Sequence, residues 1–141
     1  MKRLKLYIGC GLNGAPTEFV QAVLKLKDSL RTDYDILDFI GLNYSSTVQV
    51  YRWDIEYCVR NCDLFVAICD ERSTGLGWEL SEAIHLGTPV LAVAHKDTKI
   101  SGIVLGAAAI KPTMTFAHYN NLSQDVPDLI KKQISQLPQP V

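Results

Sequence analysis

Residues 61–94 read NCDLFVAICDERSTGLGWELSEAIHLGTPVLAVA and carry most of the information about the fold class. Two unbroken apolar runs, at residues 64–69 and 89–94, are typical of strands that are covered on both faces of a sheet. Between them, a glycine-containing turn at residues 73–77 leads into a helix expected over residues 78–86. The order strand, helix, strand favours a parallel sheet, because parallel neighbours need a long crossover between them.

The same alternation continues on both sides of this stretch. Further strands are expected at residues 4–9, 36–42 and 113–119, and further helices at residues 17–30, 100–108 and 123–137. Another helix, opened by Ser46 or Thr47, should turn six residues inward: Val48, Tyr51, Ile55, Cys58, Val59 and Cys62. The sequence therefore predicts an α/β fold, a single doubly wound five-stranded parallel sheet of flavodoxin-like or Rossmann-like type, with strand order 2-1-3-4-5 and helices on both faces. Residues 1–141 contain no repeat or linker and should form one domain.

The composition of the 141-residue chain disfavours several classes of protein. With 48% hydrophobic and 21% charged residues, the chain can fill one core and keep a soluble surface. Fourteen basic and fifteen acidic residues give a net charge of -1, without the excess of positive charge that nucleic-acid binders need. No apolar run approaches the roughly 20 residues of a membrane span, and the first residues do not resemble a signal peptide. We therefore expect a cytoplasmic protein without a nucleic-acid or membrane partner.

The cysteines and histidines do not have the spacing of a metal site. The four cysteines, Cys10, Cys58, Cys62 and Cys69, include no CxxC pair, and the three histidines are scattered. A chain with this much apolar sequence does not need disulfide bonds to fold. We expect buried free thiols and no metal centre.

The loop after the first expected strand, residues 9–14, reads GCGLNG and formally matches the dinucleotide fingerprint GxGxxG. Three interpretations are open: a dinucleotide site, a tight turn with positive φ, or a loop that lets a small ligand approach the backbone. Asp35 and Asp38 fall at the start and middle of the second expected strand instead of at its end, where the fingerprint needs an acid. The next helix also begins after the glycines. The third interpretation is therefore favoured.

Asp70 follows the third expected strand, where a receiver domain carries its phospho-accepting aspartate. Such a domain also needs an acidic pair after the first strand, where glycines stand here, and a lysine that closes the fifth strand. A receiver domain is therefore disfavoured. A flavodoxin-like redox protein is disfavoured too, because the loop after the first strand is not rich in hydroxyl groups.

The segment DERSTGLGWEL, residues 70–80, is the strongest candidate for a functional site. Gly75 and Gly77 could let the loop wrap around a ligand, and Ser73 offers a hydroxyl group. Glu79 would lie in the first turn of the following helix, where the helix dipole favours an ionised carboxylate by about 0.3–1 kcal/mol. Ordinary helix N-termini often carry the same pattern of a Ser or Thr cap followed by a Glu, so the residues alone leave both interpretations open.

The chain resembles the nucleoside 2-deoxyribosyltransferase superfamily, which includes the 2′-deoxynucleoside 5′-phosphate N-hydrolases. The likeness extends over most of the chain and is densest in residues 61–94, where a strand is followed by a Ser-x-Gly-x-Gly-aromatic-Glu turn, a helix, Gly-x-Pro and another strand. The resemblance implies that Glu79 is a nucleophile that attacks C1′ of a deoxyribosyl group, and that Tyr7 is an active-site tyrosine. It also implies that Asp54 helps to protonate the leaving base, and that Ser101 contacts a substrate phosphate, often from a neighbouring subunit.

The chain departs from this family pattern in two places. In the hydrolases the first loop reads like Gly-Ser-Ile-Arg-Gly, whereas Gly11 and Asn13 here replace the serine and arginine that hold the 5′-phosphate. Arg72 could substitute for that arginine or could be an ordinary exposed loop residue. The interval from Asp54 to Asp63 is one residue longer than in the family.

The sequence therefore predicts an enzyme that cleaves or transfers at the N-glycosidic bond of a nucleoside or nucleotide. Two carboxyl groups, Glu79 and Asp54, suit the oxocarbenium-like transition state of that reaction. The expected substrate-binding residues are Gly9, Gly11, Asn13, Arg72, Ser73, Gly75, Gly77 and Ser101. The alternative is a non-catalytic module that binds or senses a nucleotide. We expect no cofactor, and a homodimer or larger homo-oligomer in which the apolar residues 102–109 could form a contact or an internal helix.

Overall fold

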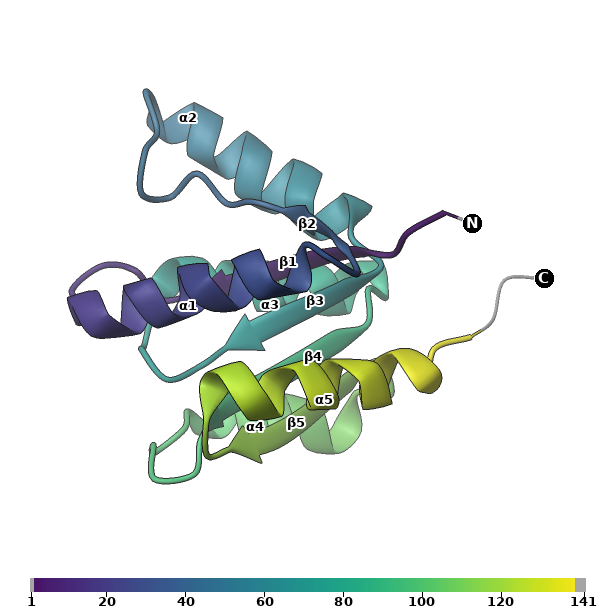
Figure 1. Cartoon of the computed structure of the whole chain (residues 1–141). Coiled ribbons are helices and arrows are strands. Elements are labelled where there is room, and N and C mark those ends of the chain that lie inside the picture. The colour runs from purple at the N-terminus through teal and green to yellow at the C-terminus, as the bar shows by residue number, and fades with distance from the viewer. Residues whose placement is uncertain (1, 139–141) are drawn as a thin grey trace.

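Five parallel strands form one sheet, in the order β2-β1-β3-β4-β5, in the computed structural model, which describes residues 2–138 (Figure 1). The strands are β1 (Lys5–Cys10), β2 (Asp35–Leu37), β3 (Leu64–Ile68), β4 (Val90–His95) and β5 (Met114–Tyr119). The helices are α1 (Thr17–Leu30), α2 (Thr47–Val50), the π-helical η1 (Tyr51–Val59), α3 (Thr74–Leu86), α4 (Gly102–Ile110) and α5 (Leu122–Ser135). This arrangement confirms the predicted fold class and strand order.

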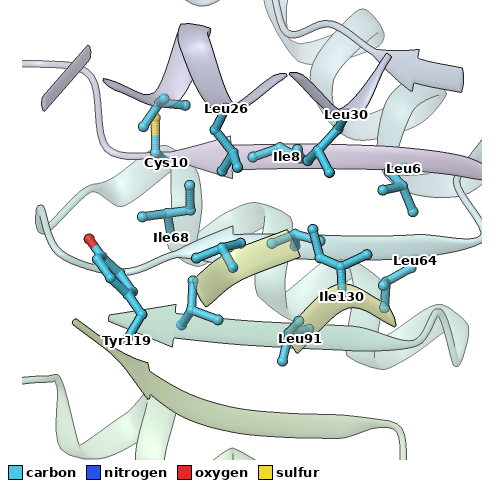
Figure 2. Packing of buried hydrophobic residues seen from close by; sticks show 14 residues of the cluster. Leu6, Ile8, Cys10, Leu26, Leu30, Leu64, Ile68, Leu91, Tyr119 and Ile130 are labelled. Carbon is cyan, nitrogen blue, oxygen red and sulfur yellow. The ribbon is translucent and has the colours of Figure 1, made fainter. Parts of the chain in front are cut away.

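Helices cover both faces of the sheet, and the alternation of side chains along β1 assigns residues to each face. Leu6, Ile8 and Cys10 point toward α1 and α5, where they join the apolar cluster drawn in Figure 2. Tyr7 points to the opposite face, where Phe65 of β3 and residues of η1 and α3 surround it. Tyr7 pairs in register with Phe65. The site described below lies on this second face.

The second strand is shorter than the expected residues 36–42, because the backbone that follows it bonds to a helix instead of to β1. The carbonyl oxygen of Asp38 accepts a hydrogen bond from Trp53 Nε1 at 2.6 Å. The amide of Ile40 donates to Asp54 Oδ1 at 2.9 Å. Side chains of η1 thus hold residues 38–40 outside the sheet.

The helix that follows this loop begins at Thr47, as expected, but changes to π-helical geometry in η1. Four of the six side chains expected on its inner side are buried: Ile55, Cys58, Val59 and Cys62. The expectation was wrong for Val48 and Tyr51, which are exposed. The reason is that α2 carries no buried residue and extends away from the sheet (Figure 1).

Helix α3 begins at Thr74, four residues before the expected start. The Ser73 side chain caps it by accepting a hydrogen bond from the amide of Leu76 at 3.2 Å. As a result, Gly75 and Gly77 lie inside the first turns of the helix and not in a loop that could wrap a ligand. Gly87, with φ +76, ends the helix in the left-handed conformation.

The structure also tests the predictions about the cysteines and about the bounds of the last two helices. Three of the cysteines are buried thiols, as expected, and Cys69 is half-buried. Helix α4 lies two residues later than expected, and α5 begins after its cap, Asn121, and ends at Ser135. Within residues 2–138, none of the helices has the length and apolar character needed to cross a membrane.

Candidate active site

A buried tyrosine and a buried glutamate meet on the second face of the sheet. The Tyr7 hydroxyl, from β1, donates a hydrogen bond to Glu79 Oε2, from α3. The side chains are only 1% and 7% exposed. The Tyr7 ring stacks on Phe65, with ring centroids 5.3 Å apart, so that the hydroxyl group is fixed in direction.

Gly9, two residues after Tyr7 on the same face of β1, leaves room for this glutamate. A Cβ atom at position 9 would lie 2.9 Å from Phe65 Cε1 and 3.3 Å from Glu79 Oε1. The first distance is shorter than a carbon–carbon contact allows. The glycine therefore permits a close approach to β1, as the sequence suggests, but the group that approaches is the Glu79 carboxyl group of the protein itself.

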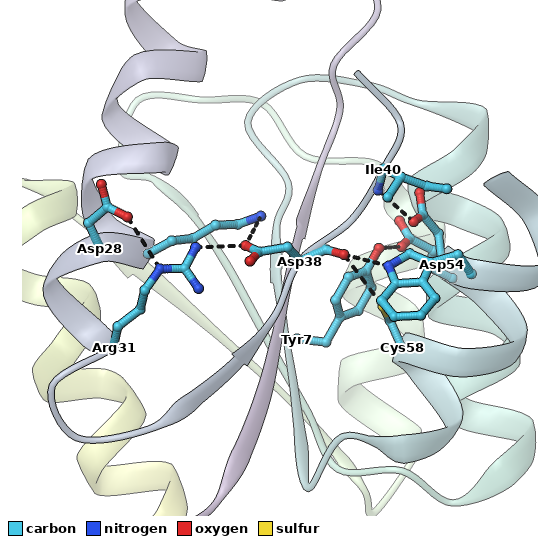
Figure 3. Close-up of polar contacts among 10 residues, drawn as sticks. Tyr7, Asp28, Arg31, Asp38, Ile40, Asp54 and Cys58 are labelled. Atoms are coloured by element: carbon cyan, nitrogen blue, oxygen red, sulfur yellow. Dashed lines mark hydrogen bonds and ion pairs between the residues drawn. The ribbon is translucent and has the colours of Figure 1, made fainter. Parts of the chain in front are cut away.

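Asp54 reaches the same region from η1. Its carboxylate accepts the hydrogen bond from the Ile40 amide described above, and its other oxygen lies 3.6 Å from the place of a Cβ atom at Gly41. Figure 3 shows the Tyr7 hydroxyl pointing toward the part of η1 that carries Asp54. The structure thus brings together the three residues expected to be catalytic, which come from β1, η1 and α3.

The environment of Glu79 keeps its carboxyl group protonated. Burial raises its pKa to about 8, and the nearby charge of Asp54 acts in the same direction. The hydrogen bond from Tyr7 and the charge of Lys27 lower the pKa and only partly oppose this effect. The expectation that the helix dipole keeps Glu79 ionised was wrong, because α3 begins at Thr74 and Glu79 lies beyond its first turn.

The pKa values of Asp54 and Tyr7 are raised as well. Burial also raises the pKa of Asp54, while the Ile40 amide and the charge of Lys27 lower it. Burial and the charge of Glu79 raise the pKa of Tyr7 well above its ordinary value, so that this hydroxyl remains a donor.

Lys27 is a charged residue near this site that the sequence did not identify. Its side chain is 1% exposed, and Nζ lies 3.4 Å from the centroid of the Phe39 ring and 3.9 Å from Asp38 Oδ1. Burial lowers its pKa to about 8. A sequence signal does exist, since Lys27 stands in the apolar stripe of α1, four residues after Val23 and three before Leu30.

The glycine-rich loop after β1 is a turn and a packing contact. Gly14 has φ +75, which confirms the interpretation as a turn with positive φ. A Cβ atom at Gly11 would lie 2.6 Å from the carbonyl oxygen of Glu71, so this glycine lets the loop pack against the one after β3. Asn13 is exposed. Helix α1 begins at Thr17, after the glycines, and does not place its N-terminus against them as a dinucleotide site requires.

The remaining candidate residues surround a separate cavity of about 940 Å³ between α3 and α4. Arg72, Ser73, Gly77 and Ser101 line it, whereas Gly75 lies on the open surface of α3 near Ser73 Oγ. Ser73 and Ser101 cap α3 and α4, since their hydroxyl oxygens accept hydrogen bonds from the amides of Leu76 and Ile103. The lining residues of this cavity do not include the three residues expected to be catalytic.

Asp70 joins the ends of neighbouring strands. Its Oδ2 atom accepts hydrogen bonds from the Tyr119 hydroxyl at 2.8 Å and from the His95 amide at 3.1 Å. These bonds tie the end of β3 to β4 and β5. Within residues 2–138, three or more His, Cys, Asp or Glu side chains do not gather anywhere in a way that could hold a metal ion.

The comparisons with known proteins show the fold. The sequence matches no protein-family model and none of the curated proteins. Among solved structures, a CMP N-glycosidase, BcmB, from Clostridium botulinum is similar with a TM-score of 0.66 and 15% identity, over 89% of this chain and 98% of that chain. A conserved protein from Enterococcus faecalis V583 is similar with a TM-score of 0.55 and 17% identity, over 96% of this chain and 100% of that chain. At these identities the likeness establishes a shared α/β fold.

Proposed function

We propose that this protein cleaves, or transfers a group at, the N-glycosidic bond of a nucleoside or nucleotide, with Glu79 as the nucleophile. The observation that carries the proposal is the buried hydrogen bond from Tyr7 to Glu79, with the carboxyl group of Asp54 nearby. Two carboxyl groups of this kind serve the cleavage of glycosidic bonds. The similarity in fold to a CMP N-glycosidase agrees with the proposal.

In the proposed reaction the bond between C1′ and the base nitrogen breaks, and its electron pair leaves with the base. Asp54 in its acid form gives a proton to the departing nitrogen. The ionised Glu79 attacks C1′ and forms a covalent glycosyl ester. Water or a second base then attacks C1′ and releases Glu79 as a carboxylate, and the acceptor's proton returns to Asp54. Tyr7 keeps Glu79 in position and stabilises its ionised form.

This reaction requires the proton of the pair to lie on Asp54, whereas Glu79 holds a proton at neutral pH in the free protein. Positive charge that develops at C1′ lowers the pKa of a carboxyl group beside it, which favours the ionised form of Glu79. The catalytic form carries one proton, on Asp54, so its abundance falls above about pH 8, where both carboxyl groups are ionised. No cofactor is required by these steps.

The remaining site residues would bind the substrate from the same edge of the sheet. They belong to the end of β1, to the loop after it and to the segments around the starts of α3 and α4: Gly9, Gly11, Asn13, Arg72, Ser73, Gly75, Gly77 and Ser101. Arg72 supplies the positive charge for a phosphate, if the substrate carries one. We also propose a homodimer or larger homo-oligomer, because Ile103 and Ile110 of α4 are 84% and 76% exposed and would be covered by a second copy.

A second candidate function is a module that binds or senses a nucleotide without turnover. Two observations favour it. The protonated Glu79 can donate a hydrogen bond to a neutral ligand, and Gly11 and Asn13 carry no positive charge for a phosphate.

Chromatographic measurement of base release separates the two functions. The purified protein is incubated with deoxynucleosides, ribonucleosides and their 5′-monophosphates, each with and without a competing free base. We expect release by the wild type and by the control Glu82→Gln, which changes another glutamate of α3, and none by Glu79→Gln. Formation of a new nucleoside with the added base would identify a transferase. Binding of a panel member without base release would favour the binding module and contradict the proposed enzyme.

A further inference from the structure

We infer that Lys27 is a positioning residue of this site, because its buried ammonium group holds residues 38–40, which orient Asp54. The inference rests on the proposed function where it concerns catalysis. Its structural basis is the segment of residues 38–40, in the loop after β2. They lie between α1, which carries Lys27, and η1, which carries Asp54 (Figure 3).

On the side of α1, two residues of this segment face cations. Lys27 Nζ lies 3.9 Å from Asp38 Oδ1 and 3.4 Å from the centroid of the Phe39 ring, which is the geometry of a cation–π contact. Arg31 Nη2 also donates to Asp38 Oδ1, at 2.8 Å. The carboxylate of Asp38 and the ring of Phe39 are thus fixed against one helix.

On the side of η1, the backbone of the same segment is bonded to side chains. The carbonyl oxygen of Asp38 accepts from Trp53 Nε1 at 2.6 Å and from Cys58 Sγ at 3.8 Å. The amide of Ile40 donates to Asp54 Oδ1 at 2.9 Å. A displacement of residues 38–40 would therefore move the hydrogen-bond donor that sets the direction of the Asp54 carboxylate.

The ion pair alone does not account for a lysine at position 27. Burial of an ammonium group is unfavourable unless a close partner compensates it. Asp38 is half-exposed and makes its shorter contact with Arg31 and not with Lys27. An apolar side chain would fit the stripe of α1 formed by Val23, Leu26 and Leu30 better. A role of Lys27 in the site of Glu79 and Asp54 therefore explains a lysine at position 27 better than the ion pair does.

The charge of Lys27 also acts on both carboxyl groups. The charged or titratable groups that influence Lys27 are Asp38, Arg31, Cys10 and Cys58, and those that influence Glu79 are Tyr7, Asp54 and Lys27. Lys27 lowers the pKa of Glu79 and of Asp54. Its replacement by a neutral residue should raise both pKa values and should loosen the contact between Ile40 and Asp54.

The test compares Lys27→Met with Lys25→Met, which removes an exposed lysine from the same helix. Carboxyl carbon NMR gives the titration midpoint of Glu79, whose signal is assigned by its loss in Glu79→Gln. We expect a higher midpoint in Lys27→Met and an unchanged midpoint in Lys25→Met. Equal midpoints in all three proteins would overturn the inference.

Hydrogen exchange at the Ile40 amide supplies a second readout. Asp38→Asn keeps the lysine but removes the carboxylate that Lys27 and Arg31 share, and Arg31→Met removes only the second cation. We expect faster exchange than in the wild type for Lys27→Met and for Asp38→Asn, and wild-type exchange for Lys25→Met and Arg31→Met. Unchanged exchange in Asp38→Asn, or exchange in Arg31→Met as fast as in Asp38→Asn, would overturn the inference even if Lys27→Met does not fold. Neither readout needs turnover. A protein without glycosidic activity would therefore contradict the proposed function, whereas the role of Lys27 could still be tested by these two measurements.

Discussion

The Tyr7 hydroxyl donates a hydrogen bond to the Glu79 carboxyl group although the two residues are 72 positions apart in the chain. The parallel order of β1 and β3 and the crossover helix α3 bring them together on one face of the sheet. Both side chains are buried, so that solvent screens this contact little. This contact links the fold to the chemistry proposed for the protein.

Removal of the Tyr7 hydroxyl should slow base release and move its fall at alkaline pH to a higher pH, because the hydrogen bond from Tyr7 lowers the pKa of Glu79. Tyr7→Phe keeps the ring that stacks on Phe65 and removes only the donor. A hydrogen bond to a charged group contributes about 1.5–3 kcal/mol, so we expect kcat/KM to fall roughly tenfold to a hundredfold. The same change at Tyr119 of β5 serves as the control. A Tyr7→Phe protein with wild-type kcat/KM would show that the contact has no catalytic role.

The rate of base release should fall as pH rises above about 8, because the last proton shared by Glu79 and Asp54 is lost there and Asp54 can then no longer protonate the leaving base. We expect a limb with a slope of minus one above pH 8, so that kcat/KM at pH 9 is about tenfold lower than at pH 7. Measurement of kcat/KM from pH 5 to 9 tests this. A rate that keeps rising from pH 7 to pH 9 would contradict the assignment of the proton donor and the nucleophile to these two carboxyl groups.

The stability of the fold should fall as pH rises, because burial raises the pKa of Glu79 in the folded protein. The carboxyl group of an unfolded chain ionises near pH 4.5, whereas Glu79 in the folded protein keeps its proton up to about pH 8. Between these values the folded state binds more protons, so the free energy of unfolding decreases as pH rises, in total by on the order of a few kcal/mol. Glu79→Gln lacks this group. Urea denaturation should show that the wild type loses stability relative to Glu79→Gln between pH 4.5 and 8; parallel curves would argue against a buried, protonated Glu79.

A side chain at position 9 should disturb both the core and the site. The Cβ atom of Gly9→Ala would lie 2.9 Å from Phe65 Cε1 in the buried sheet, and relief of this overlap should lower the free energy of unfolding by about 1–3 kcal/mol. Gly106→Ala in α4 is the control, because its Cβ atom has no neighbour within 4 Å among residues 2–138. That change should stabilise the helix by about 0.5–1 kcal/mol. If denaturation finds the two variants equally stable, the close packing at Gly9 is not real.

The sequence contains enough information for the fold because the apolar strands are short and well separated. The buried runs of β3 and β4 and the glycine that ends α3 are local signals, and they predict the parallel order that the structure confirms. The expected end of β2 was wrong for a different reason. The Asp38 carbonyl oxygen accepts a hydrogen bond from Trp53, and the Ile40 amide donates one to Asp54, so that residues 38–40 stay outside the sheet; these contacts cannot be read from local sequence.

The grouping of the three candidate catalytic residues was predictable from the sequence, and their electrostatics was not. A resemblance to known enzymes pointed to Tyr7, Asp54 and Glu79, and the structure places them near one another. The proton on Glu79 depends on burial by distant parts of the chain, which local sequence does not reveal. Lys27 escaped notice because a lysine in an amphipathic helix is usually exposed, although its place in the apolar stripe of α1 was a signal that it is buried.

The most direct test of the central claim is the mass of the protein after reaction with a 2′-deoxy-2′-fluoronucleoside. The electronegative fluorine destabilises positive charge at C1′ and should slow release of the glycosyl group from the protein. We predict a single glycosyl adduct on the intact wild-type protein, mapped by peptide mass spectrometry to Glu79, and no adduct on Glu79→Gln. An adduct on another residue, or release of the base without any adduct, would contradict the account.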